Sequence, residues 1–152
     1  MKVLITGGGG FVGSHLADAF IARGDEVFIL DTGSVIKTRH LMGNPAFHYI
    51  RDSVFNLEIL EGLIAKCDLV YHLAAVVGVE YYVGDPYEVL NVNVNGTQNV
   101  LKLAFKHQKK VVFGSTSEVE LNTTFFWCLK ASFNTFCVPL TLTLSTSYGS
   151  PT

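Results

Sequence analysis

Four consecutive glycines, Gly7–Gly10, constrain the fold of this chain more than any other feature of its sequence. They follow the short apolar run Lys2–Thr6, and Gly13 stands three positions after the last of them. Apolar residues at helical spacing begin directly afterwards, in the segment Phe11–Arg23. A strand that passes through such a glycine turn into a helix is typical of a dinucleotide-binding βαβ unit.

The glycines fit two spacings, and the sequence leaves the register open. G-x-G-x-x-G runs through Gly8, Gly10 and Gly13, whereas G-x-x-G-x-x-G runs through Gly7, Gly10 and Gly13. In either register an early glycine permits the tight turn, the middle one lets a pyrophosphate approach the backbone, and Gly13 lets the helix pack closely. The helix that starts at Phe11-Val12 would direct its free N–H groups at the phosphates, so we expect both residues in the cofactor site.

Asp31 follows the second apolar run, Glu26–Leu30, at the place where such a fold carries an acidic residue. Its carboxylate is expected to accept hydrogen bonds from the adenosine ribose hydroxyls and to repel a 2′-phosphate, which favours NAD over NADP. Lys37 and Arg39 are near in sequence and would weaken that preference. The alternative is that Asp31 is only a turn residue or a helix cap.

Strand-like and helix-like segments alternate up to about residue 120, which predicts an α/β domain of the Rossmann type. The expected strands are Lys2–Thr6, Glu26–Leu30, Phe47–Ile50, Leu69–Ala75 and Val111–Ser115, and the expected helices are Phe11–Arg23, Val54–Ala65 and Pro86 to about His107. The strands are apolar without strict alternation, as burial on both faces requires. We expect a doubly wound parallel sheet with strand order 3-2-1-4-5 and the cofactor across the strand ends between strands 1 and 4.

The composition changes after Glu120. Residues 121–152 contain one charged residue, Lys130, and many Thr, Ser and Phe. We therefore expect a cofactor-binding domain over residues 1–120 and an atypical tail over residues 121–152. Val138–Leu144 alternates like a strand, and Pro139 would place this sixth strand at an edge of the sheet.

Charge and hydropathy exclude several classes of partner. The formal net charge of -2 argues against a nucleic acid, and no apolar run is long enough to span a membrane. The first residues lack the apolar region and cleavage site of a signal peptide. Cys67, Cys128 and Cys137 fit no metal spacing, so we expect no metal and interpret them as thiols in a reducing cytoplasm.

Five segments, taken in order, identify a family. They are Thr6–Leu16 (TGGGGFVGSHL), Asp31, His72–Ala75 (HLAA), Asn93–Thr97 (NVNGT) and Gly114–Val119 (GSTSEV). The chain resembles the NAD-dependent epimerase/dehydratase family, the extended short-chain dehydrogenases. Within that family it is most similar to nucleotide-sugar 4-epimerases and related decarboxylases or dehydratases. The resemblance covers residues 1–119 and does not continue into the tail.

The resemblance implies further contacts with NAD. Asp52 and Ser53 match positions that contact the adenine, although Asp52 is equally explained as a helix cap. Leu73, Ala74 and Ala75 match the wall beside the ribose and nicotinamide half, where small residues let the backbone approach the cofactor.

The resemblance also implies residues of the reaction centre. Asn93 matches a polar position that supports the active site, and Thr116 matches the catalytic Ser or Thr whose hydroxyl holds the reacting oxygen. Ser115, beside it, is expected to face the cofactor. Glu80–Tyr82 lie in a region that faces the sugar nucleotide in relatives. His72 is interpreted as a packed residue at a strand end rather than a catalytic one.

The family pattern breaks after Val119. Relatives continue with Glu-Val-Tyr-Gly and later Tyr-x-x-x-Lys, but this chain has Glu118–Leu121 (EVEL), and the only tyrosine after Thr116, Tyr148, has no lysine after it. The resemblance therefore implies that the catalytic base and the C-terminal substrate domain are absent. A frameshift or truncation would explain the break, which resequencing of codons 115–125 tests; a genuine short variant is the alternative.

Two functions remain open at this point. The first is the NAD-binding part of a nucleotide-sugar epimerase or dehydratase, which transfers hydride between NAD and a sugar carbon. The alternative is a non-catalytic NAD-binding or redox-sensing module, and a stable chain that binds NAD without hydride transfer would favour it. Relatives often form homodimers through the helices after strands 4 and 5, but the second of these helices is not recognisable here, so the support for a homodimer is weak.

Overall fold

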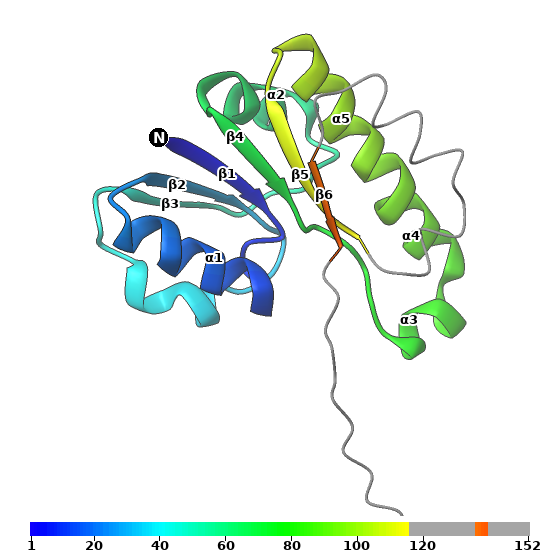
Figure 1. Ribbon diagram of the computed structural model, residues 1–152. Helices are drawn as coiled ribbons and strands as arrows, with labels where there is room; N and C mark the ends of the chain where they lie inside the picture. The colour runs from blue at the N-terminus through cyan, green and yellow to red at the C-terminus, as the bar shows by residue number, and fades with distance from the viewer. Residues whose placement is uncertain (116–135, 140–152) are drawn as a thin grey trace, which may run out of the picture.

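The computed structural model describes residues 1–115 and 136–139, which form a six-stranded sheet covered by helices (Figure 1). The strands are β1 Lys2–Thr6, β2 Glu26–Leu30, β3 Phe47–Ile50, β4 Leu69–His72, β5 Lys110–Ser115 and β6 Phe136–Pro139. Their order is β3-β2-β1-β4-β5-β6, and neighbouring strands are parallel. The expected Rossmann-type order 3-2-1-4-5 is therefore confirmed.

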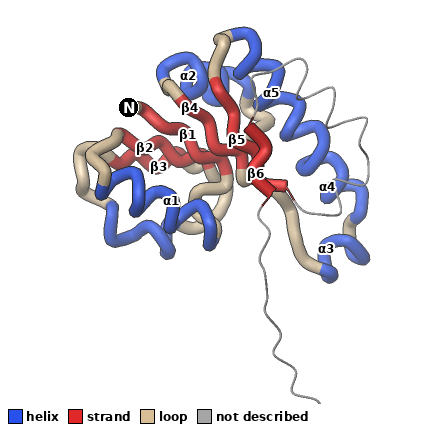
Figure 2. The backbone as a smooth tube through the Cα atoms, viewed as in Figure 1, coloured by secondary structure: helices blue, strands red, loops and turns tan. Residues whose placement is uncertain are grey.

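Helices cover both faces of the sheet (Figure 2). In chain order they are α1 Phe11–Ala22, the 3-10 helix η1 Val35–Leu41, α2 Leu57–Lys66, α3 Val79–Gly84, α4 Pro86–Leu90, the π-helical turn η2 Asn91–Gly96 and α5 Thr97–Lys106. Val3 and Ile5 of β1 share a buried cluster with Phe20 of α1, whereas Leu4 packs into a second cluster with Leu60 of α2. This alternation explains why the strands are apolar throughout, since each face of the sheet has its own core.

Two predicted boundaries differ from the structure by three residues, each for a local reason. β4 ends at His72 rather than at Ala75, because the chain leaves the ladder after the bond from the Leu73 N–H to the Thr6 carbonyl. Helix α2 begins at Leu57 rather than at Val54, because the Asn56 side chain accepts a hydrogen bond from the N–H of Ile59 and caps the helix there.

The long helix expected from Pro86 to about His107 is not uniform. Asp85 caps its start by accepting a hydrogen bond from the Glu88 N–H at 3.0 Å, and α4 then passes into η2 before α5 begins at Thr97. A π-helical turn inserts extra backbone into a helix and occurs often at functional sites. The spacing of the apolar residues does not reveal this turn, because one turn with a different period barely disturbs the apolar pattern.

The tail contributes a strand to the sheet. β6 lies parallel to β5 at the edge, as the sequence predicts, but it begins at Phe136 rather than at Val138. Pro139 is the last residue of the strand, so its missing N–H does not interrupt the hydrogen bonds between β5 and β6. The remaining part of the predicted strand, residues 140–144, lies outside the described residues.

Two other expectations concern thiols and membranes. Cys67 is buried, and burial raises the pKa of its thiol to about 11, which makes it unreactive at neutral pH. Cys128 lies outside the described residues, and the side chain of Cys137 is not described. Within the described part of the chain, no helix combines the length and apolarity needed to cross a membrane.

Leu60 and Leu57 of α2 give a direct test of this core. Leu60 is fully buried, whereas Leu57 is 50% exposed. We expect Leu60→Ala to lower the free energy of unfolding by about 2–5 kcal/mol, since it leaves a cavity under the sheet. Leu57→Ala, the same change in the same helix, should cost less than about 0.5 kcal/mol. Urea unfolding followed by circular dichroism measures both, and equal losses would contradict the placement of α2.

Candidate cofactor site

The turn after β1 brings two backbone segments into direct contact. Gly7 has a φ of 73°, a conformation that residues with a side chain rarely adopt. A Cβ on Gly7 would lie 2.6 Å from the carbonyl carbon of Leu73 and 2.6 Å from the amide nitrogen of Ala74. Because both are backbone atoms, neither can move away without shifting β4, and only glycine fits here.

The close packing of α1 depends on a second glycine. A Cβ on Gly13 would lie 2.6 Å from the carbonyl oxygen of Gly7 and from the Cα of Gly8. The three atoms nearest to a Cβ on Gly8 all belong to the side chain of Ile29. The backbone contacts at Gly7 and Gly13 favour the register G-x-x-G-x-x-G, which the sequence left open.

The N-terminus of α1 opens toward this turn. Its cap residue, Gly10, offers no side-chain hydrogen bond, and the first turn holds no acidic residue. The N–H of Gly10 donates to the carbonyl of Gly7 at 3.1 Å, which closes the turn. The following N–H groups, from Phe11 to Gly13, belong to the first turn, where a helix has no partners for them. An anion is therefore favoured at this end of α1 by both hydrogen bonding and the helix dipole.

Asp31 ties the glycine turn to the end of β2. Its Oδ2 accepts a hydrogen bond from the N–H of Gly9 at 2.8 Å, and its Oδ1 accepts one from the N–H of Gly33 at 2.7 Å. Asp31 is thus a turn residue, but this does not exclude ribose binding, because each carboxylate oxygen can accept a second hydrogen bond. Burial raises the pKa of the neighbouring Tyr49, and the charge of Asp31 adds to the effect.

Asp52 and Ser53 follow β3 at the other end of the site. Asp52 accepts hydrogen bonds from the N–H of Ser53 at 2.7 Å and from the side chain of Asn56 at 3.0 Å. Asp52 is not the helix cap, because Asn56 has that role. The hydroxyl oxygen of Ser53 accepts from the N–H of Phe55 at 3.3 Å.

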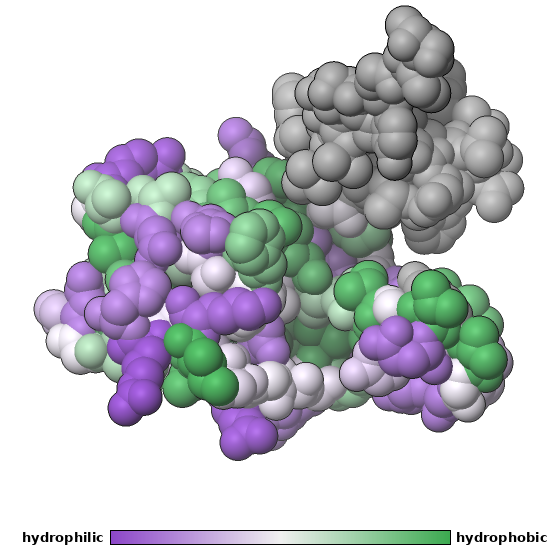
Figure 3. All heavy atoms as spheres, turned by 90° about the horizontal axis from the view of Figure 1, so that it is seen from below, coloured by the Kyte–Doolittle hydropathy of each residue, from purple (hydrophilic) through white to green (hydrophobic). Residues whose placement is uncertain are grey.

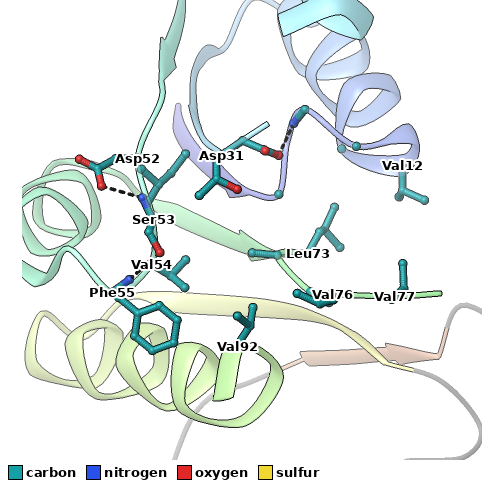
Figure 4. A pocket seen from close by; sticks show the side chains of 18 of the residues that line it. Val12, Asp31, Asp52, Ser53, Val54, Phe55, Leu73, Val76, Val77 and Val92 are labelled. Carbon is teal, nitrogen blue, oxygen red and sulfur yellow. Dashed lines mark hydrogen bonds between the residues drawn. The ribbon is translucent and has the colours of Figure 1, made fainter. Parts of the chain in front are cut away.

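These elements enclose a cleft of about 650 Å³ at the C-terminal ends of the strands. Figure 4 shows Asp52 and Ser53 at one end of it, Val12 and Val77 at the other, and Asp31 between them. The residues expected from the sequence that line it are Gly7, Gly10, Phe11, Val12, Gly13, Asp31, Asp52, Ser53, Leu73, Ala74 and Ala75. The lining residues that were not expected from the sequence are Gly9, Leu30, Thr32, Val54, Phe55, Val76, Val77, Glu88 and Val92. Thr32, Val54 and Val76 each directly follow an expected residue, so for these three the position was a usable signal.

One expected residue whose side chain is described, Asn93, does not line the cleft. Asn93 stands behind it: its side chain accepts a hydrogen bond from the Val76 N–H at 2.8 Å and donates one to the Val76 carbonyl at 3.0 Å. Asn93 therefore positions the segment Leu73–Val76, which forms the wall of the cleft, without lining the cleft itself. Thr116 lies outside the described residues, and the side chain of Ser115 is not described, so both remain predictions.

Exposed apolar side chains gather beyond the wall. Figure 3 views the molecule from the side where the strands end and shows such a surface over α3, where Val79 and Val83 are both exposed. Glu80 and Tyr81 are also exposed on α3 and are not among the residues that line the cleft. Their expected contact with a sugar nucleotide remains a prediction.

His72 is buried beneath the cleft, as its interpretation as a packed residue requires. Its ring lies within hydrogen-bond distance of the hydroxyls of Thr6 and Thr97, at 2.6 Å and 2.9 Å, and stacks on Phe113. Burial lowers the pKa of His72 to about 4, so the ring is neutral at physiological pH.

A parallel sheet with a glycine turn, an open helix N-terminus and an acidic residue after β2 defines a dinucleotide-binding protein of the Rossmann class. The model of the NAD dependent epimerase/dehydratase family matches residues 3–120. The chain belongs to this family, as its sequence motifs predict.

Individual relatives agree with this assignment. The chain is 39% identical to UDP-glucuronic acid decarboxylase 1 of Arabidopsis thaliana over 78% of its own length and 27% of that protein. It is 40% identical to the UDP-N-acetyl-alpha-D-glucosaminuronate decarboxylase of Bacillus cytotoxicus, over 78% of the chain and 37% of that protein. The chain thus spans well under half of the length of these curated relatives.

Solved structures show the same fold. A UDP-glucose 4-epimerase of Thermus thermophilus, in complex with NAD, matches with a TM-score of 0.66 and 33% identity, over 76% of this chain and 38% of that one. A dTDP-glucose 4,6-dehydratase of Streptomyces venezuelae, with NAD bound, matches with a TM-score of 0.72 and 28% identity, over 76% and 39%.

Gly7 and Gly24 test the contact at the glycine turn. Both have positive φ, 73° and 86°, but a Cβ on Gly24 would meet nothing within 4 Å. Gly24→Ala should therefore cost only the backbone strain, about 1–2 kcal/mol. Gly7→Ala adds the clash with Leu73 and Ala74, and we expect it to cost at least about 2 kcal/mol more. Equal losses in urea unfolding would show that the turn is not pressed against the wall.

His72 predicts a pH dependence of stability. Its pKa is about 4 in the folded chain against an ordinary 6.5, so only the unfolded chain binds a proton between those values. The free energy of unfolding should have its full value above about pH 6.5 and should decrease by about 3 kcal/mol as the pH approaches 4. The carboxyls of Asp25, Glu26 and Glu61 have lowered pKa values and contribute at lower pH.

The measurement is a set of urea unfolding curves across this range. The variant His72→Gln should lose most of the slope between pH 6.5 and pH 5, because it has no proton to bind. If that variant does not fold, an NMR titration of the native ring serves instead. Protonation of His72 well above pH 5 would contradict the prediction.

Proposed function

We propose that this chain binds NAD in the cleft and represents the cofactor-binding part, residues 1–120, of a nucleotide-sugar epimerase, decarboxylase or dehydratase. The observation that carries this proposal is the contact of Gly7 with the Leu73–Ala74 backbone, which leaves a groove beside the open N-terminus of α1. A Cβ at Gly7 would push the Leu73–Ala74 backbone, which lines the cleft, away from the glycine turn.

The residues fit the two halves of the cofactor. Asp31 would accept hydrogen bonds from the adenosine ribose, with Asp52 and Ser53 beside the adenine and the N–H groups of Phe11 and Val12 at the pyrophosphate. The backbone of Leu73–Val76 would form the wall at the nicotinamide half, held in place by Asn93. Bound NAD would supply a ring that takes up and returns a hydride. The protein would hold this ring in a fixed orientation and exclude water from it.

The substrate proposal follows from the relatives, which are named for UDP and dTDP sugars. We propose that a sugar nucleotide approaches from the side of Val76 and α3, and that Thr116 holds the reacting oxygen. The expected base, the Tyr of Tyr-x-x-x-Lys, is not found in the sequence given. We therefore expect binding of NAD without turnover of a sugar nucleotide by this chain.

The test is calorimetric titration of the full chain with NAD and, separately, with NADP. A 2′-phosphate about 4 Å from Asp31 costs about 4 kcal/mol at an effective dielectric constant of about 20, and even a quarter of that favours NAD about fivefold. Asp31→Asn keeps the shape of the side chain but removes its charge and one of the two acceptors for the Gly9 and Gly33 N–H groups, so it should reduce the preference for NAD to about twofold or less.

Asp18→Asn is the matched control. Asp18 is a carboxylate of α1 that pairs with His40 at 2.6 Å and does not line the cleft. Its replacement should leave both affinities unchanged. Failure of the folded chain to bind either dinucleotide would refute the proposed function, and equal binding of both would refute the role of Asp31.

A further inference from the structure

The donors and acceptors of the hydrogen bonds around His72 can be assigned in only one way. The hydroxyl of Thr97 donates its one hydrogen to the carbonyl of Asn93 at 2.7 Å. Toward His72, 2.9 Å away, this hydroxyl can then only accept, so Nε2 of the ring carries the hydrogen. In the neutral ring Nδ1 is bare and accepts from the hydroxyl of Thr6 at 2.6 Å. The path therefore runs from Thr6 through His72 and Thr97 to Asn93.

Each end of this path reaches a part of the cleft. Thr6 directly precedes Gly7, the residue pressed against the wall, and its carbonyl accepts from the N–H of Leu73 at 2.9 Å. At the other end, the side chain of Asn93 holds both the N–H and the carbonyl of Val76. The wall is thus fixed at its start by β1 and at its end by the π-helical turn η2, and His72 joins these two supports.

The ring of His72 is suited to act as a rigid spacer. It is 1% exposed, lies in the central strand β4 and stacks on Phe113 of β5 with an interplanar angle of 20°. Every polar atom of the path is occupied, so a shift at one end moves the other or breaks a buried hydrogen bond. A packed apolar residue in this place would fill the volume without fixing the distance between β1 and η2.

We propose that His72, through Thr6 and Thr97, is a positioning residue that sets the separation of the glycine turn from the wall Leu73–Val76 and thereby the fit of the nicotinamide half of the cofactor. The proposal rests on the proposed binding of NAD. It goes further because it assigns a role in cofactor binding to three buried residues that do not line the cleft. The adenosine half, which lies at Asp31 and Ser53, is outside the reach of this path.

The experiment compares NAD with ADP, which lacks the nicotinamide half, on the full chain and three variants. Thr97→Val keeps the shape of the side chain but removes the hydroxyl, so the dissociation constant for NAD should rise about tenfold while that for ADP changes less than about twofold. Thr97→Ser restores the hydroxyl and should bind NAD within about twofold of the native chain.

Thr38→Val is the matched control for the loss of a buried hydroxyl. Thr38 is fully buried in η1, and its hydroxyl donates to the carbonyl of Val35 at 3.2 Å, away from the cleft. We expect it to lower the melting temperature like Thr97→Val but to leave both dissociation constants unchanged. If Thr97 had a purely structural role, Thr97→Val would, like Thr38→Val, lower the melting temperature and leave both dissociation constants unchanged.

The outcomes separate this inference from the proposed function. No binding of NAD or ADP by the folded native chain refutes the proposed function. Binding by the native chain with NAD affinity unchanged in Thr97→Val, or with NAD and ADP weakened equally, overturns the role of the path. Nitrogen NMR of the native chain at neutral pH gives an independent reading: the hydrogen should reside on Nε2 of His72, and a hydrogen on Nδ1 would overturn the proposal even if Thr97→Val does not fold.

Discussion

The backbone at Gly7 lies against the backbone that joins Leu73 to Ala74, and the rest of the site depends on this contact. It brings the turn after β1 against the segment after β4, the point at which the sheet changes winding direction and helices cross to opposite faces. Because no side chain stands between the two segments, the open end of α1 lies directly beside the wall. A larger residue would separate them and remove the groove, whatever the remaining side chains could offer.

Charge in the cleft is arranged around this contact. The helix N-terminus provides partial positive charge without a competing side chain, while Asp31, directly after β2, is held by the N–H groups of Gly9 and Gly33. The cleft therefore has one part suited to a pyrophosphate and another suited to hydroxyl donors. His72 remains neutral beneath it, so the buried center adds no charge that would disturb either part.

Much of this arrangement could be predicted from the sequence because it depends on local pattern. The glycine turn, Asp31 and the order of the strands follow from spacing and hydropathy, and the expected edge strand in the tail was found two residues earlier than predicted. The start of α2 at Leu57 was missed although Asn56 is a residue type that commonly caps helices, and the π-helical turn η2 could not be predicted because one turn with a different period barely disturbs the apolar pattern. The position of Asn93 behind the wall was missed because its partner Val76 is 17 residues away and no sequence pattern links the two.

The hydrogen bond between Thr6 and His72 joins residues 66 positions apart in the chain. The cleft therefore cannot assemble from one local segment, because β1, β4 and the helix after it must all be in place first. Parallel sheets of this kind close long loops early in folding, which makes their formation slow. A ligand that binds only the assembled cleft would stabilise the native state by mass action, so the amount of folded chain in a cell would follow the concentration of that ligand.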